Sequence, residues 1–187
     1  QALAQQTSQE VSDTSVVKPL IQFTTQQQQQ FLYHKAYQAA LGHQWDQVAA
    51  LLQNSKLPLA VQQAPYKQVA TALFKQKRYD TAILAAKRGL SVHQDSELYM
   101  IMAQSYLQQN MLAEAYDILV SHRPNLELHP QYYGLLANTQ LQLKHYKDAQ
   151  HSYHQLATAF PDESRWWFGL AMSAQHNKDK KLAYHAY

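Results

Sequence analysis

The fold of this chain is decided by residues 130–161, PQYYGLLANTQLQLKHYKDAQHSYHQLATAFP. In the first half of this stretch, the aromatic Tyr133 stands four residues before the small Ala137, which places both on one face of a helix. In the second half, Ala149 stands four residues before Tyr153, so a second helix also has a small and an aromatic residue on one face. The stretch predicts two antiparallel helices joined by a short turn, whose small residues let the helices approach closely.

The same arrangement recurs along the chain at steps of 33 or 34 residues. One column of small residues holds Ala36, Ala70, Ala103, Ala137 and Ala171, and a second holds Val48, Ala82, Ala115, Ala149 and Ala183. Columns of larger residues hold Leu32, Tyr66, Tyr99, Tyr133 and Trp167; Trp45, Tyr79, Leu112 and Tyr146, until Lys180 breaks the pattern; and Leu52, Ala86, Leu119, Tyr153 and Tyr187. A shared period in independent columns indicates an array of helix pairs with these residues in its core.

We expect helices over residues 26–42, 45–54, 63–76, 79–91, 96–109, 112–121, 130–143, 146–159, 162–176 and 179–187. Left-handed helix ends are favoured at Gly42-His43, Asn110-Met111 and Asn177-Lys178. The prolines at positions 58, 65, 124, 130 and 161 are expected in turns or first helical turns. Thr25 with Gln28 forms a possible capping box, so the run Gln26 to Gln30 is expected to begin the first helix.

These elements divide the chain into an arm and a repeat domain. Residues 1–25 lack helical periodicity and are expected to form a linker or flexible arm. Residues 26–187 form the repeat domain, with units at approximately 29–62, 63–95, 96–129, 130–163 and 164–187. The fifth unit stops at Tyr187, so its second helix is expected to be truncated.

Composition narrows the class of protein. The 16 lysines and arginines form no run and the net charge is only +3, so no nucleic-acid partner is expected. The absence of cysteine excludes disulfides and cysteine-based metal or redox motifs, and it suits the bacterial periplasm. No apolar stretch approaches the ~20 residues that span a bilayer. Because the chain begins at Gln1, we expect any membrane anchor to have been in a removed N-terminal portion.

No motif for catalysis or for a cofactor stands out. His151 and His154 lie three residues apart on one helix with His145 nearby, but no carboxylate stands at ligand spacing beside them. They are expected to be solvent-facing, without a metal. No phosphate loop, nucleophile elbow or catalytic carboxylate pair occurs. We therefore expect a binding protein that is not an enzyme and that uses no cofactor.

The pattern Tyr133-x-x-Leu136-Ala137, then Tyr146-x-x-Ala149, Tyr153 and Pro161, resembles the tetratricopeptide repeat (TPR) family. The resemblance implies an all-α, right-handed solenoid of about five helix pairs, with a concave groove that holds a peptide or helix of another protein. The residues that it implies for this groove are Tyr33, Tyr37, Lys67, Thr71, Phe74, Met100, Gln104, Leu107, Asn138, Leu141, Phe168 and Met172, with Ala40, Gly134 and Gln175 at equivalent places.

Two alternatives for these residues stay open. The family's carboxylate-clamp subgroup grips acidic C-termini with Lys, Arg and Asn, of which the groove offers only Lys67 and Asn138. An apolar and polar groove suits a hydrophobic peptide or helix better. The other alternative is that these side chains only pack against the next unit, in which case binding would move to the convex face or to the arm, whose apolar cluster spans residues 16–21.

One stretch is more specific. Residues 165–171, RWWFGLA, following a helix that ends at Pro161, resemble the C-terminal repeat region of the MSHA type IV pilus biogenesis protein N family of marine gammaproteobacteria. The resemblance implies a scaffold on the periplasmic face of the inner membrane that binds another pilus-assembly component. The alternative is a cytosolic TPR adaptor or regulator unrelated to pili. The sequence leaves the partner's identity and the oligomeric state open.

Overall fold

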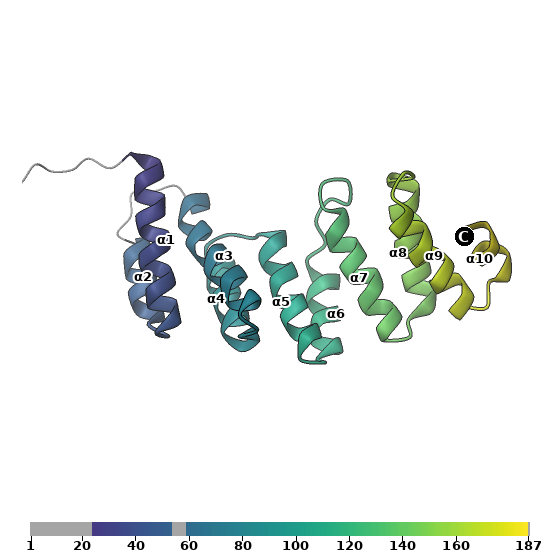
Figure 1. The fold of residues 1–187 in the computed structure, drawn as a ribbon, viewed down its shortest axis with the longest axis horizontal. Coiled ribbons are helices and arrows are strands. Elements are labelled where there is room, and N and C mark those ends of the chain that lie inside the picture. The colour runs from purple at the N-terminus through teal and green to yellow at the C-terminus, as the bar shows by residue number, and fades with distance from the viewer. Residues whose placement is uncertain (1–23, 54–58, 187) are drawn as a thin grey trace, which may run out of the picture.

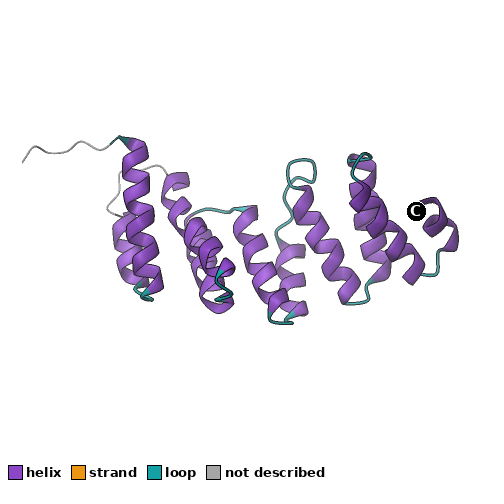
Figure 2. Cartoon of the chain, viewed as in Figure 1, coloured by secondary structure: helices purple, strands orange, loops and turns teal. Residues whose placement is uncertain are grey.

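The computed structural model describes residues 24–53 and 59–186, and every regular element within these ranges is an α-helix (Figures 1 and 2). The helices are α1 (Thr25–Leu41), α2 (Trp45–Gln53), α3 (Leu59–Lys75), α4 (Tyr79–Val92), α5 (Ser96–Gln108), α6 (Leu112–Ser121), α7 (Pro130–Gln142), α8 (Tyr146–Ala159), α9 (Ser164–His176) and α10 (Lys180–Ala186). The prediction of an all-α solenoid of about five helix pairs is confirmed. Residues 1–23 of the predicted arm lie outside the described residues, and the unit boundaries stay predictions.

The helix pairs stand side by side in one row, from α1 at one end to α10 at the other (Figure 1). The first helices of successive units contact one another, α1 with α3, α3 with α5, α5 with α7 and α7 with α9. The second helices α4, α6 and α8 each pack on the first helix of the next unit. The first helices therefore form one continuous layer. None of the described helices combines the length and the hydropathy that crossing a membrane requires.

The small-residue columns lie at the centre of this packing. Ala36 is 1% exposed and the other four alanines of its column are fully buried, while the second column ranges from 0% at Ala82 to 8% at Ala183. The large columns are less uniform: Leu32, Tyr66 and Tyr99 are buried, whereas Tyr133, Trp167 and the column from Trp45 to Tyr146 are half-buried. Small side chains thus occupy the helix crossings and the aromatic rings fill the space around them.

A left-handed residue ends the first helix of every unit. Positive φ angles of 56–64° occur at His43, Lys77, Asn110, Lys144 and Lys178, which follow the 33- or 34-residue period. At Lys144 the turn has the Schellman pattern, in which the N–H of His145 donates to the carbonyl of Gln140 at 2.8 Å. The three predicted turns are in place, but two equivalent ones at Lys77 and Lys144 carry no glycine or asparagine.

Within the predicted turns, the left-handed residue is not always the glycine or the asparagine. Gly42 has an ordinary φ of −84°, and the next residue, His43, is left-handed. Asn177 likewise has a φ of −79°, and Lys178 follows it. The register of the two packed helices sets where the chain must reverse, so the position is left-handed whichever residue occupies it.

Two further details differ from the sequence-based expectations. The capping box of α1 is formed by Thr24 and Gln27, one residue earlier than expected, with the Thr24 N–H donating to Gln27 Oε1 at 2.8 Å. The helix α3 begins at Leu59, four residues early, so Pro65 lies inside it instead of in its first turn. Pro65 is fully buried, and its packing offsets the one backbone hydrogen bond that a proline removes.

Enlarging an alanine at a helix crossing should destabilise the fold. Ala137 is fully buried. Ala137→Leu should therefore lower the free energy of unfolding by about 1–3 kcal/mol through overpacking. Ala149→Leu, at the second crossing of the same unit, should do the same. The matched control is Ala113→Leu on the exposed surface of α6, where urea unfolding should show little change. Equal effects at all three positions would contradict the crossing model.

Replacing a left-handed lysine by glycine should stabilise the protein. Lys144 has a φ of 62°, a conformation that costs energy for any residue with a Cβ, so Lys144→Gly should raise the unfolding free energy by about 0.5–1 kcal/mol. Asn110→Gly should gain less, because asparagine tolerates this conformation better. Lys147→Gly, inside the first turn of α8, should instead destabilise. Thermal or urea unfolding of the three variants measures this order.

Candidate partner-binding face

The predicted groove residues lie on the continuous layer of first helices. Tyr37, Thr71, Phe74, Met100, Gln104, Leu107, Leu141 and Met172 are half-buried, and Asn138 and Phe168 are exposed. The side chain of Tyr33 lies outside the described residues. Phe168 is the most open of the large apolar side chains here, at 57% exposure. The layer therefore presents a row of partly accessible side chains of mixed apolar and polar character.

Lys67 is already neutralised within the chain. Its Nζ lies 3.2 Å from the Asp95 carboxylate and 2.7 Å from that of Glu97. Burial lowers the pKa of Lys67, but the hydrogen bonds that it donates to Glu97 and Asp95 outweigh burial, so its pKa lies above its ordinary value. Asp95 also caps α5 by accepting from the backbone N–H groups of Glu97 and Leu98. Lys67 thus joins α3 to the start of α5, an arrangement that disfavours its use as a clamp for a partner's carboxylate.

Two other groove residues also make contacts within the chain. The hydroxyl of Tyr37 on α1 accepts a hydrogen bond from Gln76 Nε2, 3.0 Å away in the next unit. The ring of Phe74 packs at 5.7 Å against that of Tyr79, across the turn of its own unit. Packing against neighbours and partial exposure therefore coexist on this face, so the two interpretations of these residues are not exclusive.

Gly134, at one of the predicted groove positions, is covered by Trp166, which is not part of the repeat columns. A Cβ added at Gly134 would lie 2.6 Å from Cζ3 of Trp166, which is 6% exposed. Gly169 is covered in the same way by Tyr153, and Gly89 by Leu98. The sequence did contain a signal for these close contacts. A glycine inside a helix, away from any turn, indicates that a bulky neighbour packs against the backbone there.

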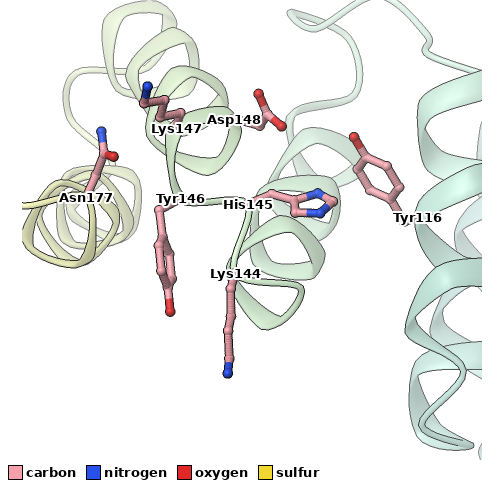
Figure 3. A pocket seen from close by; sticks show the side chains of 7 residues that line it. All are labelled: Tyr116, Lys144, His145, Tyr146, Lys147, Asp148 and Asn177. Carbon is pink, nitrogen blue, oxygen red and sulfur yellow. The ribbon is translucent and has the colours of Figure 1, made fainter.

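The turn edge of the solenoid carries open hollows. Figure 3 shows one of about 420 Å³ where α7 meets α8, lined by Tyr116, Lys144, His145, Tyr146, Lys147, Asp148 and Asn177. The rings of Tyr116 and His145 meet edge to face at 5.4 Å, which joins α6 to this turn. A second hollow of about 290 Å³ includes His151 and His154, both of which are exposed as expected. Within the described residues, no three His, Cys, Asp or Glu side chains gather to hold a metal ion.

The ionisable groups of the core are in their ordinary protonation states near neutral pH. Burial raises the pKa of Tyr132 and of Tyr153 above the ordinary tyrosine value, so both phenols stay protonated. Lys67 stays charged because its pKa is also raised. These shifts stabilise the resting charge states and prepare no acid or base for proton transfer.

Comparison with known proteins supports this architecture. A family model described as "Anaphase-promoting complex, cyclosome, subunit 3" matches residues 75–156. A MamA structure (MamA AMB-1) aligns over 84% of this chain and 87% of that one, at 17% identity and a TM-score of 0.59. A second MamA structure (RS-1 ArsTM double mutant) covers 85% and 90%, at 12% identity and a TM-score of 0.62. No curated protein sequence matches significantly.

A third similar structure is YrrB, described as "a TPR protein with an unusual peptide-binding site". It aligns over 83% of this chain and 80% of its own, at 9% identity and a TM-score of 0.58. At such identities the similarity is one of fold.

The covered glycine makes a test of the packing of α7 on α9. Alanine at position 134 would favour the helix but force its methyl group into the ring of the buried Trp166, so Gly134→Ala should lower the unfolding free energy by about 1–3 kcal/mol. Gly42→Ala is the matched control, because its new Cβ would meet nothing closer than 3.6 Å and its φ is −84°. Chemical denaturation should separate the two variants. A neutral Gly134→Ala would show that Trp166 can leave this place freely.

The period of the sequence, the paired helices with their buried alanine crossings and the similar solved structures together identify the fold as that of a tetratricopeptide-type helical solenoid.

Proposed function

We propose that this chain is a protein-binding scaffold whose layer of first helices holds a peptide or helix of a partner protein. The observation that carries the proposal is the row of half-exposed side chains from Tyr37 on α1 to Met172 on α9, which runs along contacting first helices without interruption. Such a layer offers an extended surface on a rigid support. YrrB, which shares the fold, is described as having a peptide-binding site.

The chemistry of the face favours a partner segment that is largely apolar. Phe74, Met100, Leu107 and Phe168 supply partly accessible apolar area, and Gln104 and Asn138 supply hydrogen-bonding groups that orient a bound backbone. The one lysine among the predicted groove residues, Lys67, is held by two carboxylates of the chain itself. A groove of this kind gains affinity from buried area and depends little on salt.

The more specific proposal is that the scaffold serves the assembly of a type IV pilus of the MSHA kind, or a related secretion machine, on the periplasmic face of the inner membrane. It is supported by the RWWFGLA stretch at residues 165–171 and by the absence of cysteine. Of this stretch, Trp166 packs on Gly134 and Trp167 Nε1 donates to the Pro161 carbonyl at 2.9 Å. A cytosolic adaptor or regulator is the competing proposal. Loss of surface pili in a deletion strain, restored by the full-length gene, separates the two.

Site-specific photo-crosslinking tests whether the first-helix layer is the contact surface. A photoreactive amino acid at the exposed Asn138 of α7 should capture the partner in cells. The same amino acid at the exposed Asp117 of α6 should capture less, because α6 is a second helix. Mass spectrometry of the adducts identifies the partner. Stronger capture from position 117 than from position 138 would move the binding site off this layer.

Truncating an exposed apolar side chain on this layer should weaken binding without unfolding the protein. Phe168→Ala removes a ring that is 57% exposed, so partner affinity should fall by about 1–2 kcal/mol. Leu128→Ala is the matched control, because Leu128 is 74% exposed but lies in the loop between α6 and α7. Titration calorimetry with the partner identified by crosslinking measures both. An equal loss in the two variants, or none at Phe168, would count against the groove.

A further inference from the structure

The positive charge of this protein is concentrated in one helix pair. Residues 63–95 carry six lysines and arginines and two carboxylates, Asp80 and Asp95, a net charge of +4 in a chain whose total is +3. Lys67 is paired with Asp95 and Glu97. Within the described residues, none of the other five cations lies within ion-pair distance of a carboxylate. These five are Lys75, Lys77, Arg78, Lys87 and Arg88, and we refer to them as the basic edge.

These five cations follow one another along the end of α3, the turn into α4 and one exposed stripe of α4. Lys75 is the last residue of α3, and Lys77 and Arg78 form the turn into α4. Lys87 and Arg88 lie further along α4, on the exposed stripe that also contains Asp80 and Leu84. The spacing of this stripe is that of one helical face. Lys87 comes ten residues after Lys77 and nine after Arg78, and most of this segment is helix, which puts it roughly 15 Å from the turn.

The basic edge borders two hollows. Lys77 and Arg78 line one of about 310 Å³ together with Tyr79, Asp80, Thr81 and Gln109. Gln109 Nε2 is buried there and finds no acceptor among the described residues. Arg88 lines the other, of about 630 Å³, with the turn residues His43 to Gln47 of the preceding unit. Arg78 connects the two hollows, since its Nη2 lies 3.4 Å from Nε2 of His43.

The basic edge differs from Lys67 in how its charge is balanced. The chain places two carboxylates on Lys67 of the first-helix layer, whereas no carboxylate of the described residues lies within ion-pair distance of the five cations of the basic edge. Like charges on one unit repel one another and oppose the compact state. They do not support the fold, so a negatively charged partner is the natural counterpart of this surface.

We propose that the basic edge docks an acidic segment of a protein, at a site separate from the first-helix layer. The ~15 Å between the turn cations and Lys87 corresponds to about four or five extended residues, which sets the spacing of the partner's carboxylates. A nucleic-acid backbone fits less well. It carries closely spaced phosphates, some of which would face the carboxylates of Asp46 and Asp80 in the two hollows. A peptide can place neutral residues or donors there.

The test uses the whole chain and a synthetic peptide in which two glutamate pairs are separated by about four serines, a gap that matches the span of the basic edge. Fluorescence anisotropy should detect binding at about 50 mM salt and a several-fold loss at about 200 mM, as expected for exposed charges. A peptide of the same composition with all glutamates adjacent should bind more weakly, since it reaches only one end. Equal affinity of the two peptides would overturn the docking geometry.

The variant Lys77→Glu with Lys87→Glu should lower affinity for the spaced peptide by at least about tenfold, because both ends of the edge are reversed. The matched control is Lys144→Glu with Lys147→Glu, which changes the net charge by the same amount. Lys144 is the left-handed turn residue that corresponds to Lys77, two units further along the chain. The control should lose less than about twofold. An equal loss in both double variants would show attraction by net charge only and would overturn the proposal.

Two further readouts keep the test decisive. The melting temperature of the Lys77→Glu, Lys87→Glu variant should stay the same or rise, because repulsion on the unit is relieved, so a loss of binding is not a loss of fold. A short single-stranded oligonucleotide should bind more weakly than the spaced peptide. Tighter oligonucleotide binding that the same variant abolishes would assign the edge to nucleic acid and reject an acidic protein segment. Binding to the first-helix layer is tested separately at Phe168 and Asn138, which lie in other units.

Discussion

The close approach of the two helices in each unit is the constraint on which the rest of the structure depends. It rests on a small residue at each crossing, such as Ala137 on α7 and Ala149 on α8, both without solvent exposure. Because no side chain separates the backbones there, the aromatic residues are displaced to the rim of each crossing, where they contact the neighbouring unit. The pitch of the array follows from that contact, repeated every 33 or 34 residues.

Once the crossing is set, the turn between the helices has little freedom. The first helix must end where the second begins to pack, and a single left-handed residue closes each reversal, five times in register. Lysine occupies three of these five positions although its Cβ is unfavourable there. The packing of the whole helix pair offsets the unfavourable backbone conformation of the lysine. Two of these lysines, Lys144 and Lys77, line hollows at the turn edge.

The two proposed surfaces differ in the physics of recognition. The first-helix layer has apolar side chains and a lysine that the chain neutralises itself, so its affinity comes from buried area. At the basic edge, five cations that pair with no carboxylate of the described residues border two hollows, so the proposed docking there would act through charge, at longer range and with strong salt dependence. A scaffold with both surfaces can hold an apolar segment and an acidic one, since the two are formed by different residues.

The sequence by itself determined the class of fold, the period and nearly all helix boundaries. These follow from residues three, four or about 34 apart, and periodic burial is a local property that spacing records. The residues expected in the groove came from the resemblance to the TPR family, by their place within each repeat, and their role in binding stays a prediction. Tertiary structure alone decided which of those residues are accessible.

Lys67 is bound by carboxylates 28 and 30 residues away, and Gly134 is covered by a ring from the next unit. Contacts of this kind depend on how one unit rotates against the next. No short-range pattern in the chain records that rotation. The hollows beside the basic edge have the same cause. Arg88 shares a hollow with His43 to Gln47 of the preceding unit, and Lys77 and Arg78 share one with Gln109 of the next, only after the units have packed together.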